Sequence, residues 1–166
     1  MSVSMYSASV PVFVRMLNNV AAWLEKAEAH AEAKKFDAAN FLTLRLSPDM
    51  LPLTKQVQIA SDTAKGCAAR LAGVEIPKWD DTEISLADLR ARVGKTIDYV
   101  QSVPQAQIDA GADREIVLAL RTGEMKFTGQ RFLEHRALPN FYFHVTTIYA
   151  LLRQAGVELG KADYLR

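Results

Sequence analysis

Hydrophobic residues recur at steps of three and four through four stretches of the chain, which is the spacing of one face of an α-helix. These stretches predict helices near residues 8–34, 48–72, 85–103 and 139–155. In the second stretch the steps alternate between four and three, a seam typical of helical bundles. The pattern therefore predicts an all-α protein whose helices pack as a bundle. The seam consists of Leu53, Val57, Ala60, Ala64, Cys67 and Leu71.

Residues that favour helix ends support these boundaries. Ser47 and Pro48 suit an N-cap and a first helical position, so the second helix is expected to begin near residue 48. Gly73 suits the C-terminal cap of the same helix. Ser85 is followed three residues later by Asp88, which resembles a capping box at the start of the third helix.

Between the third and fourth helices the period changes to two. Hydrophobic residues alternate within 116–120 and again within 125–127. This pattern predicts a β-hairpin near residues 115–129 with its turn at Thr122-Gly123. Two strands are too few to form a sheet domain, so the hairpin is expected to decorate the bundle.

Length and charge limit the function classes. The chain has 166 residues, which predicts a single domain over residues 1–166. Twenty basic residues stand against nineteen acidic ones, a balance that argues against a nucleic-acid or acidic-membrane surface. No apolar run is long enough to span a membrane, and the first residues do not resemble a signal peptide. We therefore expect a cytoplasmic protein.

Motifs that would name a reaction are absent from the sequence, so the catalytic residues are unknown. The chain contains no glycine-rich phosphate loop and no GxSxG elbow. Its one cysteine, Cys67, argues against an internal disulfide and a cysteine-based zinc site. Because Cys67 lies on the apolar seam, we interpret it as a core residue.

Two polar residues interrupt the apolar fourth helix and are the first candidates for a site. Asn140 and His144 lie one turn apart on the same face. We predict that His144 is buried and faces the second helix near Gln58, where Gln56, Gln58 or Asp62 could reach the imidazole. A carboxylate partner would favour the charged ring, whereas burial alone would oppose it. A structural core histidine and a functional one both fit the sequence.

Two segments resemble a known family. They are "MLPLTKQVQIASDTAKGCAARLAG" at 50–73 and "ALPNFYFHVTTIYALLRQAGVELGKADYL" at 137–165. The chain is identified through them as a member of the uncharacterised bacterial family DUF1993, within the DinB/YfiT-like group. The resemblance implies an up-down four-helix bundle, here with the small hairpin between helices three and four. Many proteins of that group are dimers, many are regarded as metalloenzymes, and some transfer thiols such as bacillithiol or mycothiol.

The resemblance also implies where a metal site would lie. The usual ligands of the group are one histidine midway along the second helix and an HxxxH pair on the last. Aligned on "LLRQAGV", His144 matches the second histidine of that pair, Asn140 the first, and Gln58 the helix-two ligand, with Gln56 and Asp62 as neighbours. His144 is thus the one candidate ligand for a divalent metal such as Zn or Ni. Asparagine and glutamine carbonyls bind these metals weakly, so a degenerate polar pocket fits the residues better.

Two functions follow as expectations. The first is a non-catalytic bundle, expected to be a homodimer, that binds a small molecule in this polar pocket. The alternative is a metal-dependent transferase or hydrolase in which His144 is a ligand or general base. The single retained histidine favours the first, and whether the protein is an enzyme is left open.

Overall fold

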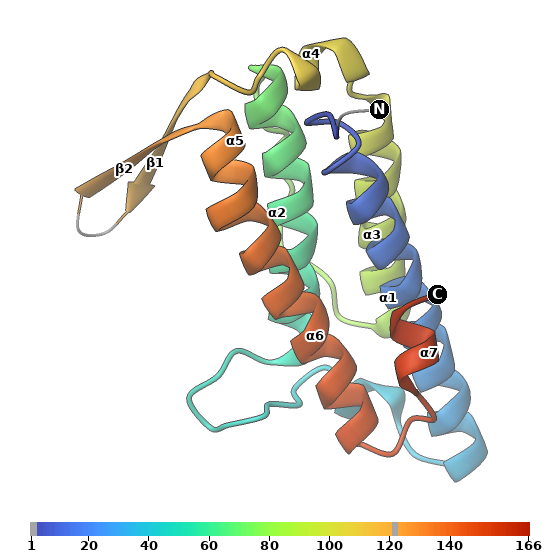
Figure 1. Cartoon of the computed structure of the whole chain (residues 1–166). Helices are drawn as coiled ribbons and strands as arrows, with labels where there is room; N and C mark the ends of the chain where they lie inside the picture. Colours follow the sequence, from blue (N-terminus) through green and yellow to red (C-terminus); the bar gives the residue numbers. More distant parts are fainter. Residues whose placement is uncertain (1–2, 121–122) are drawn as a thin grey trace.

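Four long helices and one hairpin make up most of the structure, a computed structural model that describes residues 3–120 and 123–166 (Figure 1). The predicted all-α bundle with a hairpin before its last helix is confirmed. The long helices are α1 (Val10–Lys34), α2 (Leu53–Ala72), α3 (Leu86–Ser102) and α6 (Leu138–Gln154), and the strands are β1 (Glu115–Leu120) and β2 (Gly123–Thr128).

The helices run down, up, up and down, rather than reversing at every connection (Figure 1). The linker of residues 74–85 returns along the bundle from the end of α2 to the start of α3, so these two helices are parallel. α1 and α6 run in the opposite direction and are parallel to each other. Both α3 and α6 therefore pack against α2, each on its own side.

The second helix begins later than its cap signature predicts. Ser47 donates its hydroxyl hydrogen to the Asp49 carboxylate at 2.6 Å and forms a local turn instead of a cap. A helix from residue 48 would need the backbone N–H of Pro52, which does not exist. α2 therefore starts at Leu53, directly after this proline.

The last helix begins earlier than predicted, at residue 129 rather than 139. α5 (Gly129–Phe132), the π-helical turn η2 (Leu133–Ala137) and α6 form one continuous helix, capped by the Thr128 side chain. His135, which lies before the predicted start of this helix, is therefore on it. In η2 the Leu138 N–H bonds to the Leu133 carbonyl, five residues back. Such a turn accommodates Pro139, which has no N–H to donate.

The hairpin turns an apolar face towards the bundle. Ile116 pairs with Phe127 and Leu118 with Met125 across the two strands, so these four side chains share one face. Ile116 is buried, and the Phe127 ring lies 6.2 Å from the ring of Phe132 on α5. The paired strands confirm the predicted hairpin, while the Thr122 half of its predicted turn lies outside the described residues.

Two glycines allow the base of the hairpin to approach α2 closely. A Cβ atom on Gly111 would lie 2.1 Å from the Leu71 carbonyl oxygen, and one on Gly129 would lie 1.9 Å from the Gly111 carbonyl oxygen. Gly111 follows the short helix α4 (Gln105–Asp109), and Gly129 opens α5. No larger residue fits at either crossing, so the two glycines hold β1 and α5 beside the C-terminal end of α2.

The core lies between the four long helices, and every residue of the predicted α2 seam is in it. The Phe13 ring of α1 meets the Phe141 ring of α6 edge to face at 4.8 Å. The small residues Ala60, Ala64 and Cys67 let neighbouring helices approach α2. Among the described residues, no helix has the length and apolar character needed to cross a membrane.

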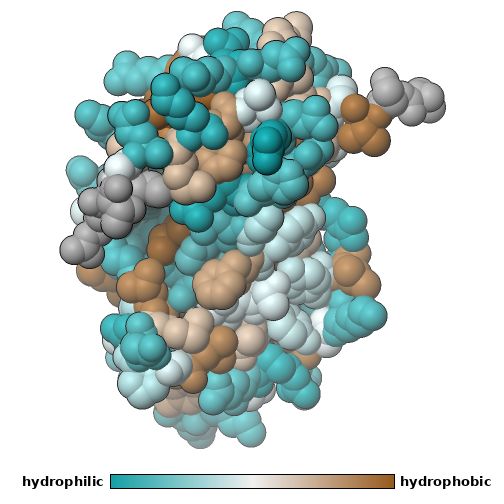
Figure 2. Space-filling model, turned by 60° about the vertical axis from the view of Figure 1, so that its left-hand side comes forward, coloured by the Kyte–Doolittle hydropathy of each residue, from teal (hydrophilic) through white to brown (hydrophobic). Residues whose placement is uncertain are grey.

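The outer face of α6 is covered in part by the short C-terminal helix α7 (Lys161–Tyr164). The hydroxyl groups of Tyr164 and Thr146 lie 2.9 Å apart, and Tyr164 stacks on Trp23. α7 thereby covers part of α6 within the chain itself. Phe143 stays exposed, but hydrophobic residues on this side of the molecule are scattered among polar ones (Figure 2). The homodimer stays a prediction.

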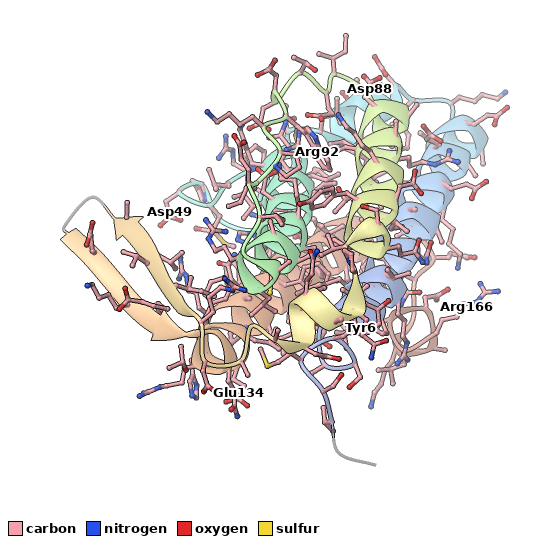
Figure 3. The ribbon with its side chains drawn as sticks, turned by 90° about the horizontal axis from the view of Figure 1, so that it is seen from above. Tyr6, Asp49, Asp88, Arg92, Glu134 and Arg166 are labelled. Carbon is pink, nitrogen blue, oxygen red and sulfur yellow. The ribbon has the colours of Figure 1, made fainter. Side chains whose placement is uncertain are left out.

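A buried arginine fastens the linker to the bundle. The Arg92 side chain on α3 is 3% exposed and points towards α2 and the linker (Figure 3). One terminal nitrogen, Nη1, binds the Glu83 carboxylate at 2.8 Å and the Asp80 carbonyl at 3.2 Å. The other, Nη2, lies 3.1 Å from carboxylate oxygens of both Asp62 and Asp81. Arg92 thus connects α2, α3 and the linker through one guanidinium group.

We expect Arg92→Met to lower the free energy of unfolding by about 3 kcal/mol, because it leaves the shielded Glu83 carboxylate without its cation. The matched control is Arg90→Met on the same helix, where the side chains of the Arg90–Glu28 ion pair are 37% and 32% exposed and water reaches the pair. That change should cost less than about 1 kcal/mol. Urea unfolding of both variants checks the difference, and equal losses would show that Arg92 is no more than a surface arginine.

The same cluster predicts loss of stability in acid. Burial alone would raise the pKa of the Glu83 carboxyl, but hydrogen bonds from Arg92 and Gln58 outweigh it and lower the pKa below 4.5. A carboxyl with a lowered folded-state pKa stabilises the protein above its unfolded-state pKa, and this contribution is lost as the pH falls through the folded value. Urea midpoints should therefore decline below about pH 4.5, less steeply in Glu83→Gln than in the exposed control Glu75→Gln. Identical slopes in the two variants would contradict this assignment.

Candidate functional site

His144 lies inside the bundle, as predicted, and faces α2. It is 8% exposed, and its Nδ1 atom lies 2.7 Å from the Gln56 side-chain oxygen. α2 and α6 are antiparallel, so the early part of α2 lies opposite the middle of α6. Gln56, one of the three predicted partners of His144, is thus the partner in the structure.

The contacts of Gln56 determine which nitrogen of His144 carries the proton. The Gln56 amide nitrogen donates to the Leu51 carbonyl at 2.9 Å, which leaves the amide oxygen facing the imidazole. An amide oxygen only accepts hydrogen bonds, so Nδ1 of His144 is the donor. In the neutral ring, Nε2 then carries the lone pair, and it has no hydrogen-bond partner among the residues that the structure describes.

The charge state that the sequence left open is resolved by this environment. Burial lowers the pKa of His144 below its usual 6.5, and the partner is a neutral amide rather than a carboxylate. The ring is therefore neutral at pH 7. A neutral amide also stabilises an imidazolium less than a carboxylate would, so the pair is a weak arrangement for general base catalysis.

Asn140 forms a second polar contact between the same two helices. Its side-chain nitrogen donates to the Thr63 hydroxyl oxygen at 2.8 Å. Asn140 is one turn before His144 on α6, and Thr63 is seven residues, or two turns, after Gln56 on α2. The contacts His144–Gln56 and Asn140–Thr63 are named here the two polar rungs of the α2–α6 interface.

Gln58 and Asp62, the other two side chains that the sequence offered as partners of His144, do not join these rungs. The Gln58 amide nitrogen donates to the Glu83 carboxylate at 2.7 Å, and an Asp62 oxygen lies 2.8 Å from Lys65 Nζ and 3.1 Å from Arg92 Nη2. Successive helical residues are rotated by about 100°, so Gln58 points almost opposite to Gln56. Both residues therefore contribute to the Arg92 cluster.

A pocket of about 250 Å³ opens beside the Asn140–Thr63 rung. It lies between α2, the hairpin strand β1 and the continuous helix that ends in α6. His144, Gln56 and Gln58 are not among its lining residues, whereas Asn140 and Asp62 are. The side chains that line it are Asp62, Thr63, Arg70, Leu118, Phe132, Arg136, Ala137, Asn140 and Ala119.

Three residues that line the pocket, Thr63, Arg136 and Arg70, were not predicted from the sequence. Thr63 is placed by its seven-residue spacing from Gln56, a signal that the sequence contains but that needs the correct helical face. Arg136 precedes Asn140 by four residues, one helical turn, but the sequence analysis placed Arg136 before the start of the helix and so missed that spacing. Arg70 resembles any cation in the last turn of a helix, and its place in a pocket depends on the hairpin above it.

The residues present do not suit a zinc or nickel ion. At the position of the expected three histidines, the structure has the imidazole of His144, a carboxamide that donates to Thr63, and a glutamine that donates to Glu83 of the linker. Throughout residues 3–120 and 123–166, no three His, Cys, Asp or Glu side chains gather closely enough to hold a metal ion. His30 packs against Phe36 instead, and His135 is exposed. No chemical step is therefore derived through a metal.

The relation of the chain to known proteins agrees with this fold. A crystal structure of a DinB family member protein from Shewanella denitrificans is 44% identical, with a TM-score of 0.91 over 97% of this chain and 91% of that chain. No curated protein matches. The model of the family DUF1993, a domain of unknown function, matches residues 5–165. The chain therefore belongs to the DUF1993 family, as its sequence motifs indicated.

Proposed function

We propose that this protein binds a small molecule in the pocket beside the Asn140–Thr63 rung, next to the degenerate metal site. The observation that carries the proposal is the polar lining of this pocket at the rung itself. Asn140 occupies the position at which the resemblance places a metal ligand. The same part of the bundle would therefore bind a small molecule through hydrogen bonds instead of a metal ion.

The rung can offer a ligand both a donor and an acceptor. The Asn140 amide nitrogen is used by Thr63, which leaves the Asn140 side-chain oxygen to accept a hydrogen bond. The Thr63 hydroxyl accepts from Asn140 and keeps its own hydrogen to donate. The pair is therefore suited to bind a polar group that both donates and accepts, such as a hydroxyl.

In this proposal the His144–Gln56 rung is structural. It fixes the register of α6 against α2 and thereby places Asn140 opposite Thr63. Cys67 is also unsuited to catalysis, because its thiol is fully buried and burial raises its pKa. The absence of an activated nucleophile among the pocket residues favours binding over catalysis. The alternative, a metal-dependent transferase or hydrolase, depends on metal binding at His144.

We expect a set of small polar fragments at millimolar concentration to shift the backbone amide resonances of Thr63, Ala137 and Asn140 in nitrogen-15 NMR spectra. Asn140→Ala removes the ligand acceptor and one side of the rung. It should weaken binding of the fragments that shift these residues by about tenfold, the equivalent of one hydrogen bond.

The matched control is Asn18→Ala on the exposed face of α1, far from the pocket in the fold. It should leave every fragment affinity unchanged. If no fragment perturbs the three pocket residues in the unaltered protein, the proposed function is wrong.

We expect His144→Leu to reduce stability by about 1–2 kcal/mol, because the Gln56 oxygen loses its donor inside the bundle. Fragment affinity in the pocket should change little. A histidine whose pKa is lowered by folding stabilises the protein above its unfolded pKa of 6.5, and that contribution is lost as the pH falls through the folded value. Urea midpoints of His144→Leu should therefore vary less below pH 6.5 than those of the exposed control His135→Leu.

Elemental analysis of the purified protein separates this proposal from the metal-dependent alternative. We expect zinc and nickel well below one ion per chain, in both the unaltered protein and His144→Leu. Stoichiometric metal that disappears in a folded His144→Leu variant would instead support the metal-dependent function.

A further inference from the structure

We propose that the ligand of this pocket is a compact organic anion, a carboxylate or a phosphate carried on an apolar group, whose charge is bound by Arg70 and Arg136. The inference rests on the small-molecule function proposed above and narrows it to one chemical class. It uses residues that neither the family resemblance nor the metal site assigns.

Arg70 is a half-buried cation without a counter-ion in the described part of the chain. It lines the pocket from the last turns of α2 and takes part in no ion pair there. Burial lowers the pKa of its guanidinium. Shielding a charge from water is unfavourable unless an opposite charge compensates it. An anionic ligand would supply that compensation.

Gly66 makes room for the Arg70 head group. A Cβ atom at position 66 would lie 2.5 Å from Arg70 Nη1, so the guanidinium occupies the space that a side chain would take. Glycine in a helix interior is less favourable than alanine. The residue of α2 with the lowest helix propensity therefore lies where the Arg70 side chain folds back along the helix. Gly66 acts as a positioning residue for Arg70.

Arg136 lies on the opposite wall of the pocket, in the π-helical turn. Phe132, Arg136 and Asn140 follow one another at steps of four, so one face of this helix presents a ring, a cation and an amide to the pocket. The Arg70 guanidinium carbon lies 5.9 Å from the centroid of the Phe132 ring. Two guanidinium groups on facing walls can bind a carboxylate or phosphate through paired hydrogen bonds.

Asp62 is the one acidic residue in the lining, and its charge is already compensated. Its Oδ1 atom lies 2.8 Å from Lys65 Nζ and 3.1 Å from Arg92 Nη2. The carboxylate is thus drawn towards the Arg92 cluster, which lies outside the pocket lining. The two arginines therefore outweigh it, and the pocket favours a negative charge.

The size and the apolar walls limit the rest of the ligand. The volume of about 250 Å³ is below the roughly 300–1,000 Å³ typical of pockets for drug-sized compounds. Leu118 of the hairpin and Phe132 of α5 supply apolar surface. A single small ring or a short chain beside the anionic group meets both conditions.

The test uses four probes of similar size and different charge. Benzoate and phenyl phosphate carry the anion, benzyl alcohol is neutral, and benzylamine is cationic at pH 7. Their dissociation constants are measured by nitrogen-15 NMR titration, followed at Thr63, Ala137 and Asn140. We expect at least one anion to bind at least ten times more tightly than benzyl alcohol, and benzylamine to bind least. The comparison between benzoate and phenyl phosphate identifies the preferred anion.

Variants assign the charge selectivity to residues. Arg70→Gln should weaken anion binding about ten- to hundredfold, as expected for loss of a charge-assisted hydrogen bond, and Arg136→Gln should also weaken it. The matched control, Arg153→Gln on the exposed face of α6, should have no effect. Gly66→Ala should displace the Arg70 head group and weaken anion binding while the melting temperature stays the same or rises.

The outcomes separate this inference from the proposed function. If benzyl alcohol binds the pocket as tightly as the anions and Arg70→Gln changes nothing, the anion inference is wrong while small-molecule binding stands. If no probe of any charge perturbs the pocket residues, both are wrong. Tight anion binding that is lost in Arg70→Gln and Gly66→Ala, and kept in Arg153→Gln, supports both.

Discussion

The Arg92 guanidinium lies where α2, α3 and the linker of residues 74–85 meet, and the arrangement of the bundle depends on it. The linker has no helix or strand of its own, yet it must run back along the bundle for α3 to start beside the start of α2. Arg92 binds three carboxylates and one carbonyl, two of these carboxylates on the linker. With α3 fixed parallel to α2 on one side, the opposite side of α2 is left for α6. The polar rungs and the pocket therefore lie on the side of α2 that the Arg92 cluster leaves open.

The helical pattern of the sequence predicted the four long helices because each has a continuous apolar face, and burial of that face in the bundle stabilises the helix. Both misplaced boundaries involve proline. Ser47 and Pro48 have the sequence of a helix start, but Pro52 has no N–H to donate the backbone hydrogen bond that a helix from residue 48 needs. At Pro139 the opposite error occurred, since a π-helical turn absorbed a residue that normally ends a helix. The conformational preference of a proline disfavours a helix at its position, but the packing of the whole helix determines whether the helix continues through it.

The candidate site was predictable in part for the same reason. A histidine and an asparagine one turn apart in an apolar helix must face a polar partner, so their burial against α2 followed from the sequence. Which glutamine meets His144 did not follow, because Gln56 and Gln58 differ only by the rotation of α2 about its axis. In the structure the buried apolar seam of α2 faces the core, and Gln58 and Asp62 contact Glu83 and Arg92 instead of His144. The exact rotation of α2 in the packed bundle thus decides which glutamine meets His144.

Arg92 and Arg70 differ in a way that separates structural from functional charge in this fold. Arg92 is nearly inaccessible, and both of its terminal nitrogens are paired with acceptors from two parts of the chain, α2 and the linker. Arg70 is half-buried, lies beside Gly66 and over the Phe132 ring, and has no ion pair among the described residues. Folding alone gives a reason for the first arrangement, because the linker needs an anchor. For the second it gives only the favourable position of a cation in the last turn of α2, which half-burial of the charge without an ion pair opposes. A residue that the fold places at a cost, in a pocket with a second arginine and a polar rung, is best explained by what the pocket binds.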